Sequence, residues 1–242
     1  MKYGLQLYSV RDITNTQMDR VLCEISKMGY SYAEFAGFFD YSAEQIKQML
    51  DKYSLEVCST HTGWTELSDE TFEKTVAYHK YIGNKNIIIP GADLSTQEKL
   101  DRFIEFVNRV QPRLEKEGIA LHYHNHSREF VTTDYGKIIH NELEKHTNLK
   151  FEIDTYWCYH AGCDPIETIT RLKDRIDFIH IKDGMRDGAG KPLGLGEAPV
   201  AEVYKTAKEL GFTMVVESET LTPSGLDEAR ICMDYLKKAE KI

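Results

Sequence analysis

The sequence reads LHYHNH at residues 121–126 and FEID at residues 151–154, then FIHIKD at 178–183 and MVVE at 214–217. Each of these apolar or aromatic runs is typical of a buried strand, and each carries histidine or acidic residues at or near its end. A helix-like stretch precedes each run. Because the carboxyl ends of parallel strands lie at one edge, we expect the four sets of polar side chains to converge.

The rest of the chain repeats this alternation of strand and helix. Strands are predicted at residues 3–9, 32–36, 56–61, 86–90, 119–124, 149–154, 178–182 and 212–217. Helices are predicted at residues 16–28, 43–53, 69–82, 96–117, 135–145, 165–172, 200–210 and 226–240. Eight repeats within 242 residues predict a single-domain (β/α)₈ TIM barrel over residues 1–242. An open doubly wound sheet is the alternative, but residues 7–15, LYSVRDITN, lack its glycine-rich phosphate loop.

Composition narrows the class of partner. The net charge is −9 and no basic run stands out, which argues against duplex nucleic acid and anionic membranes as partners. The first residues, MKYGLQLYSV, are too short and polar for a signal peptide, and no apolar stretch approaches a transmembrane helix. The five cysteines are scattered, as expected for free thiols in a reducing cytoplasm, where we expect the protein to reside.

Alternation along the strands selects the candidate metal ligands. They are His124 (or His122) on the fifth strand, and then Asp154, His180 and Glu217 on the next three. Mixed imidazole and carboxylate ligands suit Mn²⁺, Zn²⁺, Co²⁺ or Fe²⁺ better than Ca²⁺. Such a cation can bind a ketose through its carbonyl and adjacent hydroxyl, acidify the α-proton and stabilise an enediolate.

Other polar residues near strand ends are candidates for substrate contact or proton transfer. Lys182 is expected to bind a sugar oxygen or a phosphate, or to neutralise Asp154 or Glu217. The candidates for substrate binding are Gln6, Glu34, His61, His122, Glu129 and Trp157. The fifth-strand metal position has four candidates: His122, His124, His126 and Glu129. Those that do not bind the metal are expected to contact the substrate or to shuttle protons. Four further histidines are expected at the surface: His79, His140, His146 and His160.

Several longer motifs resemble a known family. They are GLQLYSVR at residues 4–11, YAEFAG at 32–37, YHNHSREF at 123–130, IDTYWCYHAGCDP at 153–165, FIHIKDG at 178–184 and VVES at 215–218. This set resembles the sugar phosphate isomerase/epimerase family of xylose isomerase-like TIM barrels. Its relatives include inosose dehydratases, ketose 3-epimerases and 3-keto-glycoside lyases or hydratases. The resemblance extends over essentially the whole chain.

The resemblance implies one divalent metal, most often Mn²⁺, with Zn²⁺, Co²⁺, Fe²⁺ or Mg²⁺ as alternatives. In the family, Glu, Asp, His and Glu on strands five to eight hold it, and Asp154, His180 and Glu217 match the last three. The first ligand position differs from the family pattern, because many relatives have Glu-Asn-His where this chain has His124-Asn125-His126. By that match His124 replaces the glutamate and His126 takes part in acid/base chemistry. Glu129 is an alternative source of the carboxylate.

These observations predict a metal-dependent isomerase or epimerase of a small sugar or sugar derivative. Glu217 or His126 is expected to move the proton, and Lys182 or Glu34 to orient the substrate. Loss of a β-leaving group after the same first step would instead give a lyase or dehydratase. Metal-assisted hydrolysis of DNA and a non-catalytic sugar-binding barrel are the remaining alternatives. The oligomeric state stays open, with a homodimer as one expectation.

Overall fold

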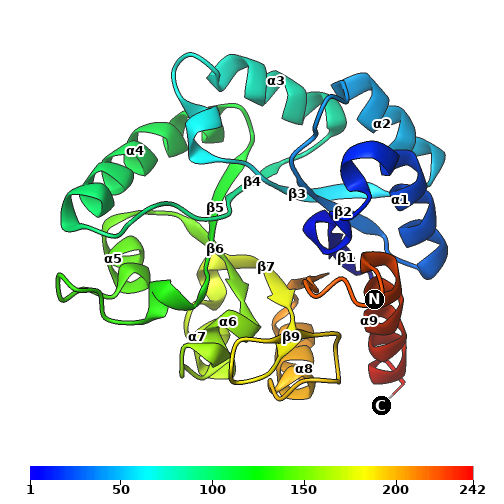
Figure 1. Ribbon diagram of the computed structural model, residues 1–242. Coiled ribbons are helices and arrows are strands. Elements are labelled where there is room, and N and C mark those ends of the chain that lie inside the picture. The colour runs from blue at the N-terminus through cyan, green and yellow to red at the C-terminus, as the bar shows by residue number, and fades with distance from the viewer. Residues whose placement is uncertain (242) are drawn as a thin grey trace.

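The computed structural model describes residues 1–241, and eight parallel strands form a closed barrel with helices around it (Figure 1). The barrel strands are β1 (Gly4–Gln6), β2 (Tyr32–Ala36), β3 (Glu56–His61), β4 (Asn86–Ile89), β5 (Ala120–His124), β6 (Lys150–Asp154), β7 (Ile176–Ile181) and β10 (Thr213–Val216). The first and eighth barrel strands pair, with Gly4 opposite Val215. The TIM barrel predicted from strand and helix alternation is confirmed.

Nine α-helices lie in residues 1–241, where the sequence predicted eight. They are α1 (Thr14–Met28), α2 (Ala43–Lys52), α3 (Phe72–Ile82), α4 (Gln97–Lys116), α5 (Ile139–His146), α6 (Thr155–His160), α7 (Pro165–Arg171), α8 (Val200–Leu210) and α9 (Gly225–Ala239). The extra helix is α6, which starts directly after β6. Asp164 caps α7 by accepting a hydrogen bond from the backbone N–H of Ile166 at 2.8 Å. No helix in this part of the chain has the length and apolarity needed to cross a bilayer.

Short 3₁₀ helices and one small sheet complete the fold. The 3₁₀ helices are η1 (Leu7–Val10), η2 (Trp64–Leu67), η3 (Ser127–Phe130) and η4 (Lys173–Arg175). The small sheet pairs β8 (Asp183–Gly184) with β9 (Gly190–Lys191) in the loop that follows β7. Because η1 begins at Leu7, the prediction of a strand over residues 3–9 is wrong beyond Gln6. The Gln6 side chain accepts a hydrogen bond from the Tyr8 backbone N–H at 2.9 Å and supports this turn.

The inward-facing side chains stack in layers along the barrel axis. A small apolar layer of Cys58, Phe178 and Val215 fills the lower interior. Strand register places His180 opposite Val215 on β10 and Asp154 on β6. Since side chains alternate along each strand, polar residues two positions further on lie one layer higher. The fold therefore stacks ionisable groups above an apolar floor, toward the carboxyl ends of the strands.

Two of the four histidines expected at the surface are buried, so that prediction is wrong for His79 and His140. His79 is 2% exposed, and its Nε2 lies 2.9 Å from the hydroxyl of Thr60. His140 is 1% exposed and its ring stacks between Phe130 and Phe151, with centroids 4.7 and 4.5 Å away. Both histidines occupy the inward faces of their helices. His146 is exposed and His160 is partly exposed.

Candidate functional site

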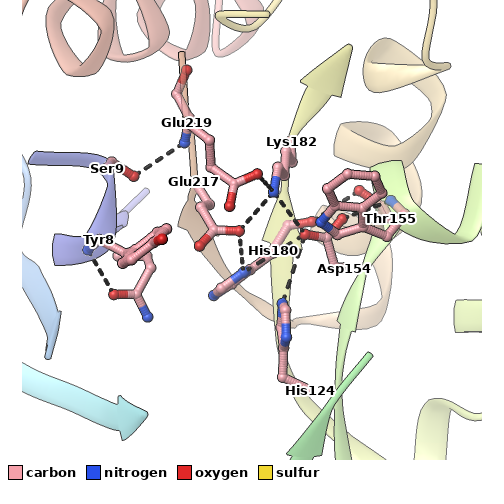
Figure 2. A network of polar contacts seen from close by, with 12 residues as sticks. Tyr8, Ser9, His124, Asp154, Thr155, His180, Lys182, Glu217 and Glu219 are labelled. Carbon is pink, nitrogen blue, oxygen red and sulfur yellow. Dashed lines mark hydrogen bonds and ion pairs between the residues drawn. The ribbon is translucent and has the colours of Figure 1, made fainter. Parts of the chain in front are cut away.

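The four predicted metal ligands meet at the carboxyl end of the barrel (Figure 2). His124, Asp154, His180 and Glu217 are all buried, and one ligand atom from each lies within 4.8 Å of the others. His180 Nδ1 is 3.4 Å from Glu217 Oε2 and 3.9 Å from Asp154 Oδ2, and His124 Nε2 is 3.7 Å from Asp154 Oδ2. Ligand atoms bound tetrahedrally at about 2.1 Å lie roughly 3.4 Å apart, so these distances suit one cation.

Unpaired polar atoms support a cation in this group. His124 Nε2, Asp154 Oδ2 and His180 Nδ1 are buried and form no hydrogen bond with the described residues. A buried polar atom without a partner is costly, and coordination to a cation would give each of the three atoms a partner. The donor set of two imidazoles and two carboxylates matches divalent ions such as Mn²⁺, Zn²⁺, Co²⁺ or Fe²⁺. The group can therefore hold one divalent metal.

Asp154 combines a structural role with a free ligand atom. Its Oδ1 accepts a hydrogen bond from the Trp157 backbone N–H at 2.8 Å and caps α6. The side chain of Asn125 bonds both backbone groups of Asp154, which ties the end of β5 to the end of β6. Burial raises the pKa of Asp154, although the charge of Lys182 opposes this shift. Only Oδ2 is left to face the other ligands.

Lys182 is buried among carboxylates. Its Nζ lies 2.9 Å from Glu217 Oε2, 2.5 Å from Glu219 Oε2 and 3.5 Å from Asp154 Oδ2. Burial lowers the pKa of Lys182, but these carboxylates outweigh burial and raise it above its ordinary value. Lys182 therefore remains an ammonium ion. Of the roles considered from sequence, neutralising Asp154 and Glu217 is the one this geometry supports directly.

A pocket of about 350 Å³ opens above the ligand group. Its lining residues are Tyr8, Ala36, His61, Pro90, His124, His126, Glu217 and Glu219. The volume lies at the lower end of the range for small-molecule sites. A larger hollow of about 810 Å³ lies near α2 and α3, away from the ligand group. The barrel mouth is therefore the candidate active site because of its ionisable residues and not because of its volume.

Two predicted substrate contacts, His61 and Trp157, and the predicted acid/base residue His126 lie in or beside this pocket. His61 faces it from β3, with its ring 5.0 Å from that of His124. His126 lines it from the loop after β5, and the Trp157 ring lies 6.2 Å from the His126 ring. His126 Nδ1 and Trp157 Nε1 form no hydrogen bond with the described residues. Both atoms are buried, so a ligand in the pocket would reach them only after local movement of the side chains around them.

Two predicted contacts lie deeper than expected. Glu34 and Gln6 are both fully buried, and Gln6 Nε2 donates to Glu34 Oε2 at 2.7 Å. Glu34 Oε2 also lies 2.6 Å from His180 Nε2, on the side of the ring opposite the ligand group. Strand alternation correctly places both side chains inside the barrel but does not give their depth.

His122 and Glu129 are not brought to the ligand group. His122 Nε2 lies 3.1 Å from Asp177 Oδ2, and the ring packs against Phe178 in the lower interior. Glu129 is buried in η3, where it accepts hydrogen bonds from the His126 backbone N–H at 2.9 Å and from the Tyr123 hydroxyl at 3.1 Å. Of the four fifth-strand candidates, His124 is the one that joins the ligand group.

Two acidic residues of this region were not among the site residues predicted from the sequence. Glu219 lines the pocket and pairs with Lys182. Glu152 is fully buried, and its Oε2 lies 2.8 Å from His61 Nε2 and 3.2 Å from His180 Nε2. The available signal was the spacing of two residues that separates Glu219 from Glu217 and Glu152 from Asp154, since such pairs share one side of a strand.

Known proteins share this architecture and part of the sequence. An inosose dehydratase of Geobacillus kaustophilus is 24% identical over 195 residues, which cover 70% of this chain and 63% of that protein. The match therefore spans less than two thirds of that curated relative. A sugar phosphate isomerase/epimerase of Parabacteroides distasonis has a TM-score of 0.84 at 26% identity, covering 98% of both chains. An L-ribulose 3-epimerase has a TM-score of 0.75 at 14% identity, covering 100% of this chain and 95% of that one, and shows the fold alone.

The family resemblance predicted from the sequence motifs is confirmed. A family model described as xylose isomerase-like TIM barrel matches residues 22–239. The relatives compared above are sugar-modifying proteins by their names. The chain belongs to the xylose isomerase-like TIM barrel family.

Proposed function

We propose that this protein is a metal-dependent isomerase or epimerase of a small sugar or sugar derivative, acting by removal of a proton next to a carbonyl. One observation carries the proposal: His124, Asp154, His180 and Glu217 meet directly below an open pocket lined by further ionisable groups. A divalent cation bound there would supply Lewis acidity toward a carbonyl oxygen and its neighbouring hydroxyl. The sugar phosphate isomerase/epimerase of 26% identity agrees with this chemistry by its name.

The chain's own residues divide the remaining work. His126 lines the pocket, so its imidazole can accept the α-proton and return it. Glu217 is the alternative base, but its Oε2 is already engaged by Lys182 at 2.9 Å. Lys182 stays protonated and balances the charge of the carboxylates. Trp157 lies beside the pocket, and its buried indole N–H, which has no partner among the described residues, is a candidate donor to a substrate hydroxyl.

A dehydratase is the second candidate, and the inosose dehydratase relatives favour it. The first step, removal of the α-proton, is the same. In a dehydratase, a hydroxyl on the next carbon then leaves as water after protonation by an acid in the pocket. His61 lines the pocket and is positioned to serve as that acid, since Glu219, which also lines it, is already paired with Lys182 at 2.5 Å.

Solvent deuterium incorporation tests the shared first step. Ketopentoses, ketohexoses and keto-inositols are incubated in D₂O with Mn²⁺-loaded protein, and the α-carbon is followed by NMR. We expect exchange with at least one ketose, and loss of exchange in Asp154→Asn and His126→Ala but not in His160→Ala, a partly exposed histidine on α6. A new sugar stereoisomer identifies the epimerase or isomerase, and an unsaturated ketone identifies the dehydratase. Sugar binding without exchange for every ketose would contradict both proposals.

A further inference from the structure

A second layer of ionisable side chains lies directly beneath the metal-ligand group. It consists of Glu34 and Glu152 together with His61, whose ring also lines the pocket beside His124, and it shares His180 with the group above. Glu34 and Glu152 are fully buried, and the His61 side chain is 9% exposed. The four side chains come from β2, β3, β6 and β7, so the layer spans half of the barrel strands.

His180 connects the two layers through its two ring nitrogens. Nδ1 faces upward, 3.4 Å from Glu217 Oε2, and Nε2 faces downward, 2.6 Å from Glu34 Oε2. A neutral imidazole carries its proton on one nitrogen and a lone pair on the other. If the proton is on Nε2 and this N–H donates a hydrogen bond to Glu34, the lone pair of Nδ1 is available to a metal.

Glu34 is itself held in place from two sides. Gln6 Nε2 donates to its Oε2 at 2.7 Å, and the Ser59 hydroxyl donates to its Oε1. Gln6 is fixed in turn by the Tyr8 backbone N–H, at 2.9 Å from its Oε1. These donors come from β1, η1 and β3, so the carboxylate cannot turn away from His180 without breaking buried hydrogen bonds.

We propose that Glu34 is a positioning residue that keeps the His180 proton on Nε2 and thereby makes Nδ1 the metal-binding atom. Glu152, 3.2 Å from the same Nε2, and His61, 2.8 Å from Glu152, close the layer around it. This inference rests on the metal site of the proposed function but not on the reaction. It assigns a role in metal affinity to a residue that cannot reach the substrate pocket.

The four ligand atoms of the lower layer also lie within 4.8 Å of one another, a spacing that a second cation would require. Distances favour hydrogen bonding instead. The Glu34–His180 separation of 2.6 Å is a charge-assisted hydrogen bond, shorter than the roughly 3.4 Å between ligands of one tetrahedral ion. The two arrangements exclude each other, since a nitrogen that carries a proton cannot coordinate a metal.

Metal affinity measured by chelator competition tests the inference. We compare wild type with Glu34→Gln and Glu34→Ala, using Mn²⁺ and Zn²⁺ as probes. Glu34→Ala should weaken binding by about 10–100-fold. Glu34→Gln should lose less, because an amide oxygen still accepts from Nε2. The control is His79→Ala, which removes a buried, hydrogen-bonded side chain on α3 and should lower stability without changing metal affinity.

A spectroscopic measurement on the wild type keeps the test valid even if a variant fails to fold. In ¹⁵N-histidine-labelled, Zn²⁺-loaded protein, we expect His180 to bind zinc through Nδ1 and to carry hydrogen on Nε2. Zinc on Nε2, or unchanged affinity in both Glu34 variants, would overturn the inference. A second metal equivalent lost with Glu34 would also overturn it and assign a cation site to the lower layer. Failure of wild type to bind any metal would instead reject the metal site itself.

Discussion

Replacing Lys182 with methionine is expected to destabilise the metal-free protein strongly. Lys182 is 1% exposed and lies within 4 Å of carboxylate oxygens of Asp154, Glu217 and Glu219. Methionine has a similar length but no charge, so the variant leaves the carboxylates buried without this counter-ion. Removing one partner of a buried ion pair typically costs about 3–5 kcal/mol.

The size of the effect can be stated as a melting temperature. For a chain of this length, 1 kcal/mol corresponds to about 2–4 °C, so Lys182→Met should melt roughly 6–20 °C below wild type after treatment with chelator. Adding Mn²⁺ should raise the melting temperature of the variant more than that of wild type. The reason is that a divalent cation offsets the unbalanced carboxylate charge.

The assay is thermal unfolding followed by circular dichroism, with and without Mn²⁺. Lys80→Met is the matched control, because Lys80 forms a 2.9 Å pair with Glu117 while its side chain is 53% exposed. Such surface pairs contribute about 0–1 kcal/mol. A loss in Lys182→Met no larger than in this control would refute the assignment of Lys182 as the counter-ion of the site.

Two further predictions concern stability and loop order. Burial lowers the pKa of His140 to about 3, whereas a histidine in the unfolded chain titrates near 6.5. The contribution of neutral His140 to the free energy of unfolding is therefore fully present above pH 6.5 and is lost as the pH falls toward 3. Between pH 7 and pH 5, the free energy of unfolding measured in urea should fall by about 2 kcal/mol less in His140→Phe than in wild type. Identical pH dependence in both proteins would contradict this. Asp183 accepts hydrogen bonds from the backbone N–H groups of Gly194 and Gly196, each at 2.9 Å, in the loop after β7. Asp183→Asn should weaken these bonds and make the loop, which contains Arg186 and Lys191, more susceptible to cleavage by trypsin. Unchanged limited proteolysis would contradict this.

The barrel and its ligands could be predicted because both depend on short-range patterns. Alternating strands and helices predict a parallel barrel, and a ligand near the end of each of four strands predicts convergence. The depth of an inward-facing side chain along the barrel axis is not encoded in these patterns. Gln6 and Glu34 face inward as expected, but they lie below the pocket, whose lining includes Tyr8 and Ala36, each two residues further along the chain.

Local side-chain bonding accounts for the other differences. Glu129 remained a candidate ligand in sequence, yet its carboxylate is used to bond the His126 backbone N–H, three residues earlier, within η3. His140 looked like a surface residue of a polar helix. Its spacing from the buried Leu143 in fact places it on the inward face of α5, and this helical spacing was the available signal.

Metal content of protein purified without chelator tests the central claim most directly. Wild type is compared with His124→Ala and Glu129→Ala by elemental analysis, before and after incubation with Mn²⁺. We predict about one divalent metal per chain in wild type and in Glu129→Ala, and loss of that metal in His124→Ala. No metal in wild type even after incubation, or loss in Glu129→Ala alone, would contradict the site described here.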